Sequence, residues 1–150
     1  MKRAVFPGSF DPITLGHQDI INKGLRVFDE IIIGIGENSD KKYMFSAEKR
    51  FEFVSTTFDK IKKIDVKCYS GLTVDFCKEN DAQFIIRGLR NPADFEFEKS
   101  IALTNREMTG IETVFFLTHS KNSFISSSIV RDLIKNKGDY KLFIPKGLSI

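Results

Sequence analysis

The sequence has no tryptophan, only two cysteines and four prolines, and no long hydrophobic run. Cys68 and Cys77 lie nine positions apart without a Cys-x-x-Cys pair, so they favour buried structural thiols in a reducing compartment over a metal or redox centre. No apolar run approaches the roughly 20 residues of a membrane span. The apolar run before Pro7 is too short for a signal peptide. We therefore expect a cytoplasmic protein that does not enter a membrane.

The charge is nearly balanced, with 23 Lys and Arg against 20 Asp and Glu. A nucleic-acid-binding domain would more typically carry a dense basic stripe with interleaved aromatic residues. The nearest basic run, residues 60–63, is short and typical of a solvated helix end. Nucleic acid is therefore a minor alternative. The length of 150 residues and the hydrophobic content of 41% predict one globular domain, residues 1–150.

Short apolar runs alternate with amphipathic stretches along the whole chain. This alternation predicts an α/β fold, a single doubly wound domain whose five-stranded parallel sheet has helices on both faces. We expect the strands at residues 4–6, 30–35, 64–69, 83–87 and 113–117. We expect the helices at residues 16–28, 46–58, 73–80, 92–109 and 126–138.

In folds of this kind, ligands bind at the carboxyl ends of the strands, near the point where the strand order reverses. Four loops should therefore converge there, at residues 8–17, 41–42, 87–90 and 123–128. All four contain side chains of the types that commonly bind phosphate. Gly34 and Gly36 imitate a dinucleotide fingerprint, but the third glycine and an immediately following helix are absent, so we reject that motif.

The first loop ends at His17, in the opening turn of a helix, where the helix dipole is positive. An imidazole there can donate hydrogen bonds to phosphate oxygens and stabilise charge that develops in a transition state. Gly8 leaves room for a ligand oxygen, and Ser9 offers a hydroxyl donor. Taken alone, this segment could also be an ordinary glycine- and proline-rich turn.

Arg87 closes an otherwise apolar strand, which favours phosphate binding because an unpaired buried guanidinium is costly. One of Lys41 and Lys42 should neutralise phosphate, and the residues alone do not say which. Glu98 could bond a sugar or base, or could be an exposed helix carboxylate. The three serines 126–128 at a helix N-terminus form a possible anion site, or one cap followed by two ordinary serines.

Two segments, Thr14–His17 and Ile125–Ser128, resemble the nucleotidyltransferase superfamily with its Thr/His-x-Gly-His motif. Together with residues 8–12, 41–42, 86–90 and 93–96, the resemblance narrows to the phosphopantetheine adenylyltransferase family and spans roughly residues 2–145. It implies reversible transfer of an adenylyl group from ATP to 4′-phosphopantetheine, giving 3′-dephospho-coenzyme A and pyrophosphate. It also implies a Mg²⁺ cofactor and a homo-oligomer, usually a hexamer.

The resemblance assigns roles to matching residues. His17 would stabilise the transition state, and no protein residue would ligate Mg²⁺, which would be held mainly by the ATP phosphates. The phosphopantetheine contacts would be Ser9, Lys41, Thr73 and Arg87. The ATP contacts would be Ser9, Phe10, His17, Gly88, Leu89, Arg90, Glu98, Asn122, Ser123, Phe124, Ile125, Ser126, Ser127 and Ser128.

The chain offers no convincing general base, and the implied reaction needs none. A phosphate monoester with a second pKa near ~6 is already largely ionised at neutral pH and can attack the α-phosphorus itself. Two other hypotheses remain. One is another small nucleotidyltransferase that uses CTP or a mononucleotide acceptor, and the other is a non-catalytic nucleotide-binding module.

Overall fold

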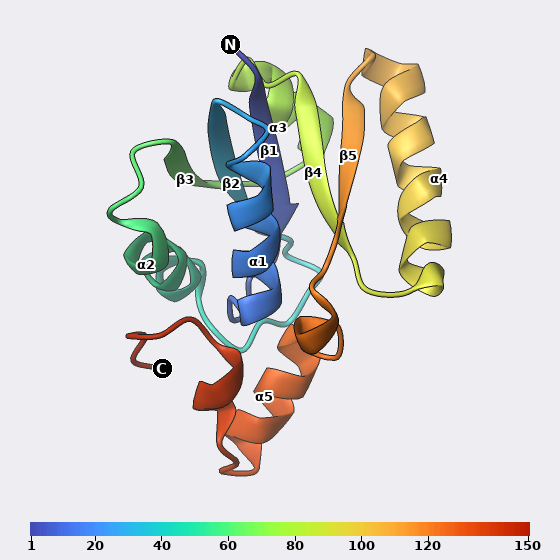
Figure 1. Cartoon of the computed structure of the whole chain (residues 1–150). Helices are drawn as coiled ribbons and strands as arrows, with labels where there is room; N and C mark the ends of the chain where they lie inside the picture. Colours follow the sequence, from blue (N-terminus) through green and yellow to red (C-terminus); the bar gives the residue numbers. More distant parts are fainter.

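The computed structural model describes all 150 residues and contains one five-stranded parallel sheet (Figure 1). The strand order is β3-β2-β1-β4-β5, with the reversal between β1 and β4. This confirms the predicted doubly wound sheet. The strands are β1 (Arg3–Gly8), β2 (Glu30–Gly36), β3 (Ile64–Tyr69), β4 (Phe84–Leu89) and β5 (Glu112–Leu117).

Helices cover both faces of the sheet. In Figure 1, α1 and α2 lie in front of it and α3 behind it, while α4 stands beside β5 and α5 lies beyond the carboxyl ends of the strands. No helix combines the length and the apolar character that a membrane crossing requires. The helices are α1 (Leu15–Gly24), α2 (Ala47–Phe58), α3 (Thr73–Glu79), α4 (Pro92–Thr109) and α5 (Ser127–Lys135), with short 3₁₀ turns η1 (Ser120–Asn122) and η2 (Tyr140–Phe143).

All ten predicted elements exist, and the differences lie at their ends. Helix α4 has the predicted bounds: the Asn91 side chain caps it by accepting from the Asp94 N–H, and Gly110 ends it in the left-handed region at φ 77°. Strand β1 runs two residues further than expected, because its pairing with β2 continues to Gly8. Helices α1 and α5 stop earlier than their apolar patterns indicated.

Strand β2 is the centre of the core. Ile31 and Ile33 pack with the α1 and α2 side chains, whereas Ile32 packs on the opposite face against α3. The continuous β-branched run was predicted to be buried on both faces, and this is confirmed.

Cys77 on α3 is buried as expected, but Cys68 is exposed. The expectation for Cys68 was wrong because β3 is an edge strand that the helices cover incompletely.

The sheet opens at its switch point. Strand β1 pairs with β2 along its whole length but with β4 only at Ala4 and Val5. Beyond Val5 the carboxyl ends of β1 and β4 are not paired. The Arg87 Nη1 crosses this gap and donates to the Pro7 carbonyl at 2.8 Å. The fold therefore creates an opening between two central strands, at the position where the connectivity rule expects a ligand.

Gly88→Ala should lower the free energy of unfolding by about 1–3 kcal/mol through overpacking. A Cβ at this position of β4 would lie 2.7 Å from the Ile20 Cγ1 on α1, the helix that carries His17. Urea-induced unfolding measures the effect. As a control, the double variant with Ile20→Ala should be less destabilised than the sum of the two single variants. Strict additivity would show that no steric conflict exists.

Candidate active site

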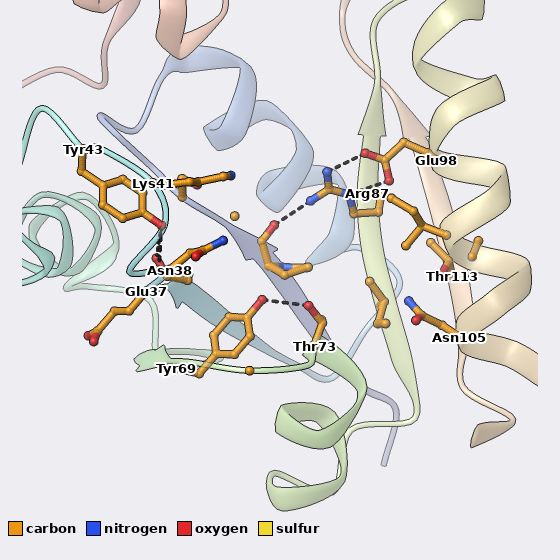
Figure 2. A pocket seen from close by; sticks show the side chains of 18 residues that line it. Glu37, Asn38, Lys41, Tyr43, Tyr69, Thr73, Arg87, Glu98, Asn105 and Thr113 are labelled. Atoms are coloured by element: carbon orange, nitrogen blue, oxygen red, sulfur yellow. Dashed lines mark hydrogen bonds and ion pairs between the residues drawn. The ribbon is translucent and has the colours of Figure 1, made fainter. Parts of the chain in front are cut away.

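Two adjoining pockets lie at the carboxyl ends of the strands. The Lys41 pocket, about 370 Å³, is lined by the ends of β1 to β4 together with residues of α3 and α4 (Figure 2). The His17 pocket, about 290 Å³, is lined by the first loop, the start of α1, the end of β4 and the start of α5. The two pockets share five lining residues: Pro7, Gly8, Ser9, Arg87 and Glu98.

The predicted convergence of the four loops is therefore found in the structure. The loop after β1 and the end of β4 line both pockets, the loop after β2 lines the Lys41 pocket, and the start of α5 lines the His17 pocket. The expected phosphopantetheine contacts all line the Lys41 pocket: Ser9, Lys41, Thr73 and Arg87. Nine expected ATP contacts line the His17 pocket: Ser9, Phe10, His17, Gly88, Arg90, Glu98, Ile125, Ser126 and Ser127.

Five expected ATP contacts line neither pocket: Leu89, Asn122, Ser123, Phe124 and Ser128. Leu89 is buried, whereas Phe124 is exposed and packs edge-on against Phe143. The Ser128 hydroxyl accepts a hydrogen bond from Arg131 at 3.0 Å. The Leu89, Phe124 and Ser128 side chains are thus engaged in packing or local hydrogen bonding.

His17 is fixed by the cap of its own helix. The Thr14 N–H donates to the His17 Nδ1 at 3.0 Å, and the Thr14 hydroxyl accepts from the His17 N–H, which completes a capping box. Because Nδ1 accepts a backbone N–H, the neutral ring must carry its proton on Nε2. Burial, and then the nearby Arg87 and Arg90, lower the pKa of His17 to about 4. At neutral pH the ring is therefore an uncharged donor.

The Arg87 guanidinium is held by three hydrogen bonds to two residues. Its Nε and Nη2 donate to the two Glu98 oxygens at 2.9 and 2.5 Å, and its Nη1 donates to the Pro7 carbonyl. A guanidinium has five N–H groups, so two remain free for a ligand. Dashed lines in Figure 2 mark these bonds. Glu98 is 8% exposed, so the alternative of an exposed helix carboxylate was wrong.

Arg90 is oriented by a second carboxylate of α4. Its backbone N–H donates to Asp94 at 2.9 Å and its Nε donates at 3.2 Å. Asp94 and Glu98 lie one helical turn apart on α4. Glu98 pairs with Arg87 in β4, and Asp94 pairs with Arg90, which directly follows that strand. The two carboxylates reduce the mutual repulsion of the arginines while leaving both guanidinium groups in the pocket wall.

In the Lys41 pocket, the structure distinguishes the two candidate lysines. Lys41 lines the pocket and Lys42 does not, and Lys41 forms no ion pair within the chain. Elsewhere in the pocket wall, the Tyr69 hydroxyl bonds the Thr73 hydroxyl at 2.8 Å (Figure 2). The Tyr69 ring also stacks on Phe76. Lys41 is therefore a cation without an ion-pair partner, and it lines the same pocket as Ser9 and Arg87.

The start of α5 is fastened to the first loop. The Ser126 hydroxyl caps the helix by accepting from the Ile129 N–H, while the Ser127 hydroxyl donates to the Pro12 carbonyl at 2.9 Å. Arg131 donates to the Asp11 carbonyl at 2.9 Å and also lines the His17 pocket. Ser127 therefore joins the start of α5 to the first loop, in addition to any contact that these serines make with a ligand.

Sequence reasoning missed Tyr43, Tyr69 and Asn105, which line the Lys41 pocket. Tyr69 ends β3, so the rule that singled out Arg87 at the end of β4 could have found it. Asn105 lies on α4 one turn after Ile101, with no sequence signal that separates it from a surface residue. Tyr43 bonds Asn38 and Gly36 across its own loop, a contact that only the folded loop reveals.

Residues 5–133 match the family described as Cytidylyltransferase-like. Relatives named phosphopantetheine adenylyltransferase align over the full chain. The protein of Flavobacterium johnsoniae is 57% identical over 150 residues, covering 100% of this chain and 99% of the relative. That of Flavobacterium psychrophilum is 58% identical with the same coverage. That of Bacteroides fragilis is 44% identical and covers 100% of both chains.

Two solved structures share the fold at low sequence identity. A bifunctional NMN adenylyltransferase/ADP ribose pyrophosphatase from Francisella tularensis has a TM-score of 0.77 at 15% identity, over 98% of this chain and 46% of that one. A lipopolysaccharide core biosynthesis protein from Thermoplasma volcanium has a TM-score of 0.56 at 20% identity, over 79% and 97% of the two chains. These likenesses confirm the Rossmann-like nucleotidyltransferase fold.

The low pKa of His17 predicts a loss of stability in acid. The unfolded chain has the ordinary His pKa of 6.5, and the folded chain has a pKa of about 4. Between these values the unfolded state binds more protons, so the free energy of unfolding should fall as the pH falls from about 6.5 to about 4. Urea unfolding of the protein and of His17→Gln checks this. The stability difference between them should change across that window, and parallel pH profiles would contradict the assigned pKa.

Proposed function

The chain belongs to the phosphopantetheine adenylyltransferase family, and we propose that its two pockets divide the two substrates of this reaction between them. The enzyme transfers an adenylyl group reversibly from ATP to 4′-phosphopantetheine, and the products are 3′-dephospho-coenzyme A and pyrophosphate. The observation that carries the proposal is the shared wall: Ser9 and Arg87 line both pockets, where the two phosphate groups would have to meet.

The phosphate of phosphopantetheine binds in the Lys41 pocket, and the triphosphate of ATP binds in the His17 pocket. Lys41 and Arg87 face the acceptor phosphate, and Thr73 contacts phosphopantetheine farther along the pocket. These positions are supported by the free Lys41 amine and by the two unengaged N–H groups of Arg87. Ser9 lies between the substrates and contacts both.

The acceptor phosphate itself is the nucleophile. One of its oxygens forms a bond to the α-phosphorus of ATP, and the bond from that phosphorus to the bridging oxygen breaks, so that pyrophosphate leaves with the electron pair. Since the acceptor is already ionised near pH 7, no side chain has to remove a proton. The protein positions two polyanions in line and offsets their repulsion.

His17 stabilises the transition state as a hydrogen-bond donor. Its Nε2–H is the ring's remaining donor, and the residue lies in the first turn of α1, where the helix dipole favours negative charge. Charge that develops on the transferring α-phosphoryl group would be met by this donor. A ring with a pKa of about 4 is neutral at working pH, which suits a fixed dipole rather than a general acid or base.

The remaining ATP contacts are assigned to Phe10, Arg90, Gly88 and Leu89, and to residues 122–128. Glu98 lines the His17 pocket and is assigned to the same set, and it also orients Arg87, because both of its oxygens accept from that guanidinium.

Mg²⁺ is carried mainly by the ATP phosphates. The chain has no group of three or more His, Cys, Asp or Glu side chains that could hold a metal ion. The carboxylates of the His17 pocket are engaged: Asp11 accepts two backbone N–H groups, and Asp94 and Glu98 accept from the arginines. When bound, the ion would offset phosphate charge.

The enzyme forms a homo-oligomer, a hexamer by family resemblance. Helix α4 supports this, because Glu98 is its only buried residue and large apolar side chains on it are exposed, among them Phe97 at 69% and Met108 at 57%. The two free cysteines suit the reducing cytoplasm, where we place the protein.

Pyrophosphate release tests the function. The protein with MgATP and 4′-phosphopantetheine should release pyrophosphate and form 3′-dephospho-coenzyme A. Matched reactions should give far less product when CTP replaces ATP, or when nicotinamide mononucleotide replaces the acceptor. A preference for CTP would support the cytidylyl-transferring alternative instead. Nucleotide binding without any transfer would support a non-catalytic module.

His17→Ala should lower kcat by about 10²- to 10³-fold, the usual loss when one preorganised transition-state donor is removed. ATP binding in the ground state should weaken much less, as measured by titration calorimetry on the same preparation. Equal losses in kcat and in ATP affinity would contradict the role in the transition state.

Arg87→Ala should chiefly raise the KM for phosphopantetheine, by about tenfold or more, because a charge-assisted contact to the acceptor phosphate is lost. Initial rates at varied concentrations of each substrate separate the two KM values. Arg26→Ala on the exposed surface removes the same charge and serves as the control. A selective loss of ATP affinity would reassign Arg87 to the nucleotide.

A further inference from the structure

Arg50 is the largest side chain that is completely buried, and it lines neither pocket. It lies in the first turns of α2, behind the ends of β1 and β2. All its hydrogen bonds go to carbonyl oxygens: Nε donates to Phe45 at 3.2 Å, and Nη1 donates to Ser9 at 2.8 Å and Gly36 at 2.9 Å. Arg50 takes part in no ion pair.

A buried guanidinium without a carboxylate is costly, and packing alone does not explain it. Its carbonyl partners belong to three segments that surround the site. Ser9 follows β1, Gly36 ends β2, and Phe45 lies in the loop between β2 and α2 that carries Lys41. The guanidinium carbon also lies 3.8 Å from the centre of the Tyr43 ring in the same loop. One planar group therefore joins the first loop to the Lys41 loop.

The bond to the Ser9 carbonyl has a consequence for the next amide. The peptide bond between Ser9 and Phe10 is trans, so its N–H points opposite to its C=O. With the carbonyl held by the buried Arg50, the Phe10 N–H is turned away from that side. This N–H has no hydrogen-bond partner within the chain, and both Ser9 and Phe10 line the His17 pocket.

Phe10 adopts a conformation that needs such a restraint. Its φ is 50°, in the left-handed region that a residue with a bulky side chain rarely occupies. The side chain is 1% exposed and packs on the His17 ring, with centroids 4.8 Å apart. Strained residues of this kind persist only where the surroundings fix them, and they cluster at functional sites. Arg50 supplies a fixed bond to the peptide unit immediately before the strained residue.

We propose that Arg50 is a positioning residue that aims the Phe10 amide at a phosphate oxygen of the nucleotide and holds the Lys41 loop beside it. This inference rests on the proposed placement of the triphosphate in the His17 pocket. The residue acts through Ser9 and Phe10 and does not touch substrate. Its charge polarises the Ser9 carbonyl, which makes the attached N–H a stronger donor. Lysine cannot replace it, because an ammonium lacks the planar fork that spans Phe45, Ser9 and Gly36 while stacking on Tyr43.

Pyrophosphate binding to the full-length protein tests the proposal. Arg50→Lys keeps the charge and removes the fork, and Arg50→Met removes both. Lys49→Met, on the exposed side of the same helix, changes the net charge equally and serves as the control. Titration calorimetry at a temperature well below the unfolding midpoint of each variant gives the dissociation constant of the folded protein. Backbone amide NMR follows the Phe10 N–H during the same titration.

Both Arg50 variants should bind pyrophosphate about tenfold to hundredfold more weakly, as expected when a charge-assisted hydrogen bond is lost or misdirected. The KM for ATP should rise and kcat should fall in the folded protein, while Lys49→Met should match the parent. The downfield shift of the Phe10 amide proton on binding should be lost in Arg50→Lys.

Folded Arg50→Lys and Arg50→Met that bind pyrophosphate like the parent and keep its Phe10 shift would overturn the proposal and leave Arg50 a stability role only. Pyrophosphate binding does not depend on adenylyl transfer. A parent protein that binds pyrophosphate but transfers no adenylyl group would therefore refute the proposed function without affecting this result.

Discussion

The site depends on the Arg87 guanidinium in the opening between β1 and β4. The two strands pair only at Ala4 and Val5, and the space beyond is crossed by the bond from Arg87 to the Pro7 carbonyl. Glu98 fixes the other edge of the same group through two hydrogen bonds. The result is a rigid cation with two free N–H groups in the wall that both pockets share. Of the five residues that line both pockets, Arg87 is the only one with a positive charge.

The positive charges of the two pockets are only partly neutralised by carboxylates of the chain. Carboxylates of α4 engage Arg87 and Arg90, while Lys41 forms no ion pair within the chain. The same arginines, after burial, keep the pKa of His17 at about 4. A neutral histidine in a cationic pocket is suited to donate one directed hydrogen bond. This arrangement fits a reaction whose nucleophile arrives already ionised, and it explains why the chain has no convincing general base.

All five strands and all five α-helices could be predicted from the sequence, although not all of their ends, because β-branched runs, helical periodicity and caps such as Asn91 and Gly110 are local signals. The four converging loops also followed, since a parallel sheet brings the carboxyl ends of its strands together. Contacts made across the fold could not be predicted. The pairing of Arg87 with Glu98, the exclusion of Lys42 and the burial of Arg50 all depend on distances between distant segments. An arginine in a helix is usually exposed, so nothing in the sequence distinguished Arg50 from the charged residues around it.

We propose that the site positions two polyanionic substrates for one direct, in-line transfer with no covalent enzyme intermediate. The stereochemical course at the α-phosphorus tests this mechanism. With ATP made chiral at that phosphorus by a single sulfur atom, 4′-phosphopantetheine as acceptor and the product configuration determined, one displacement should invert the configuration. Retention would require two displacements through an adenylylated side chain, and it would contradict this account of the site.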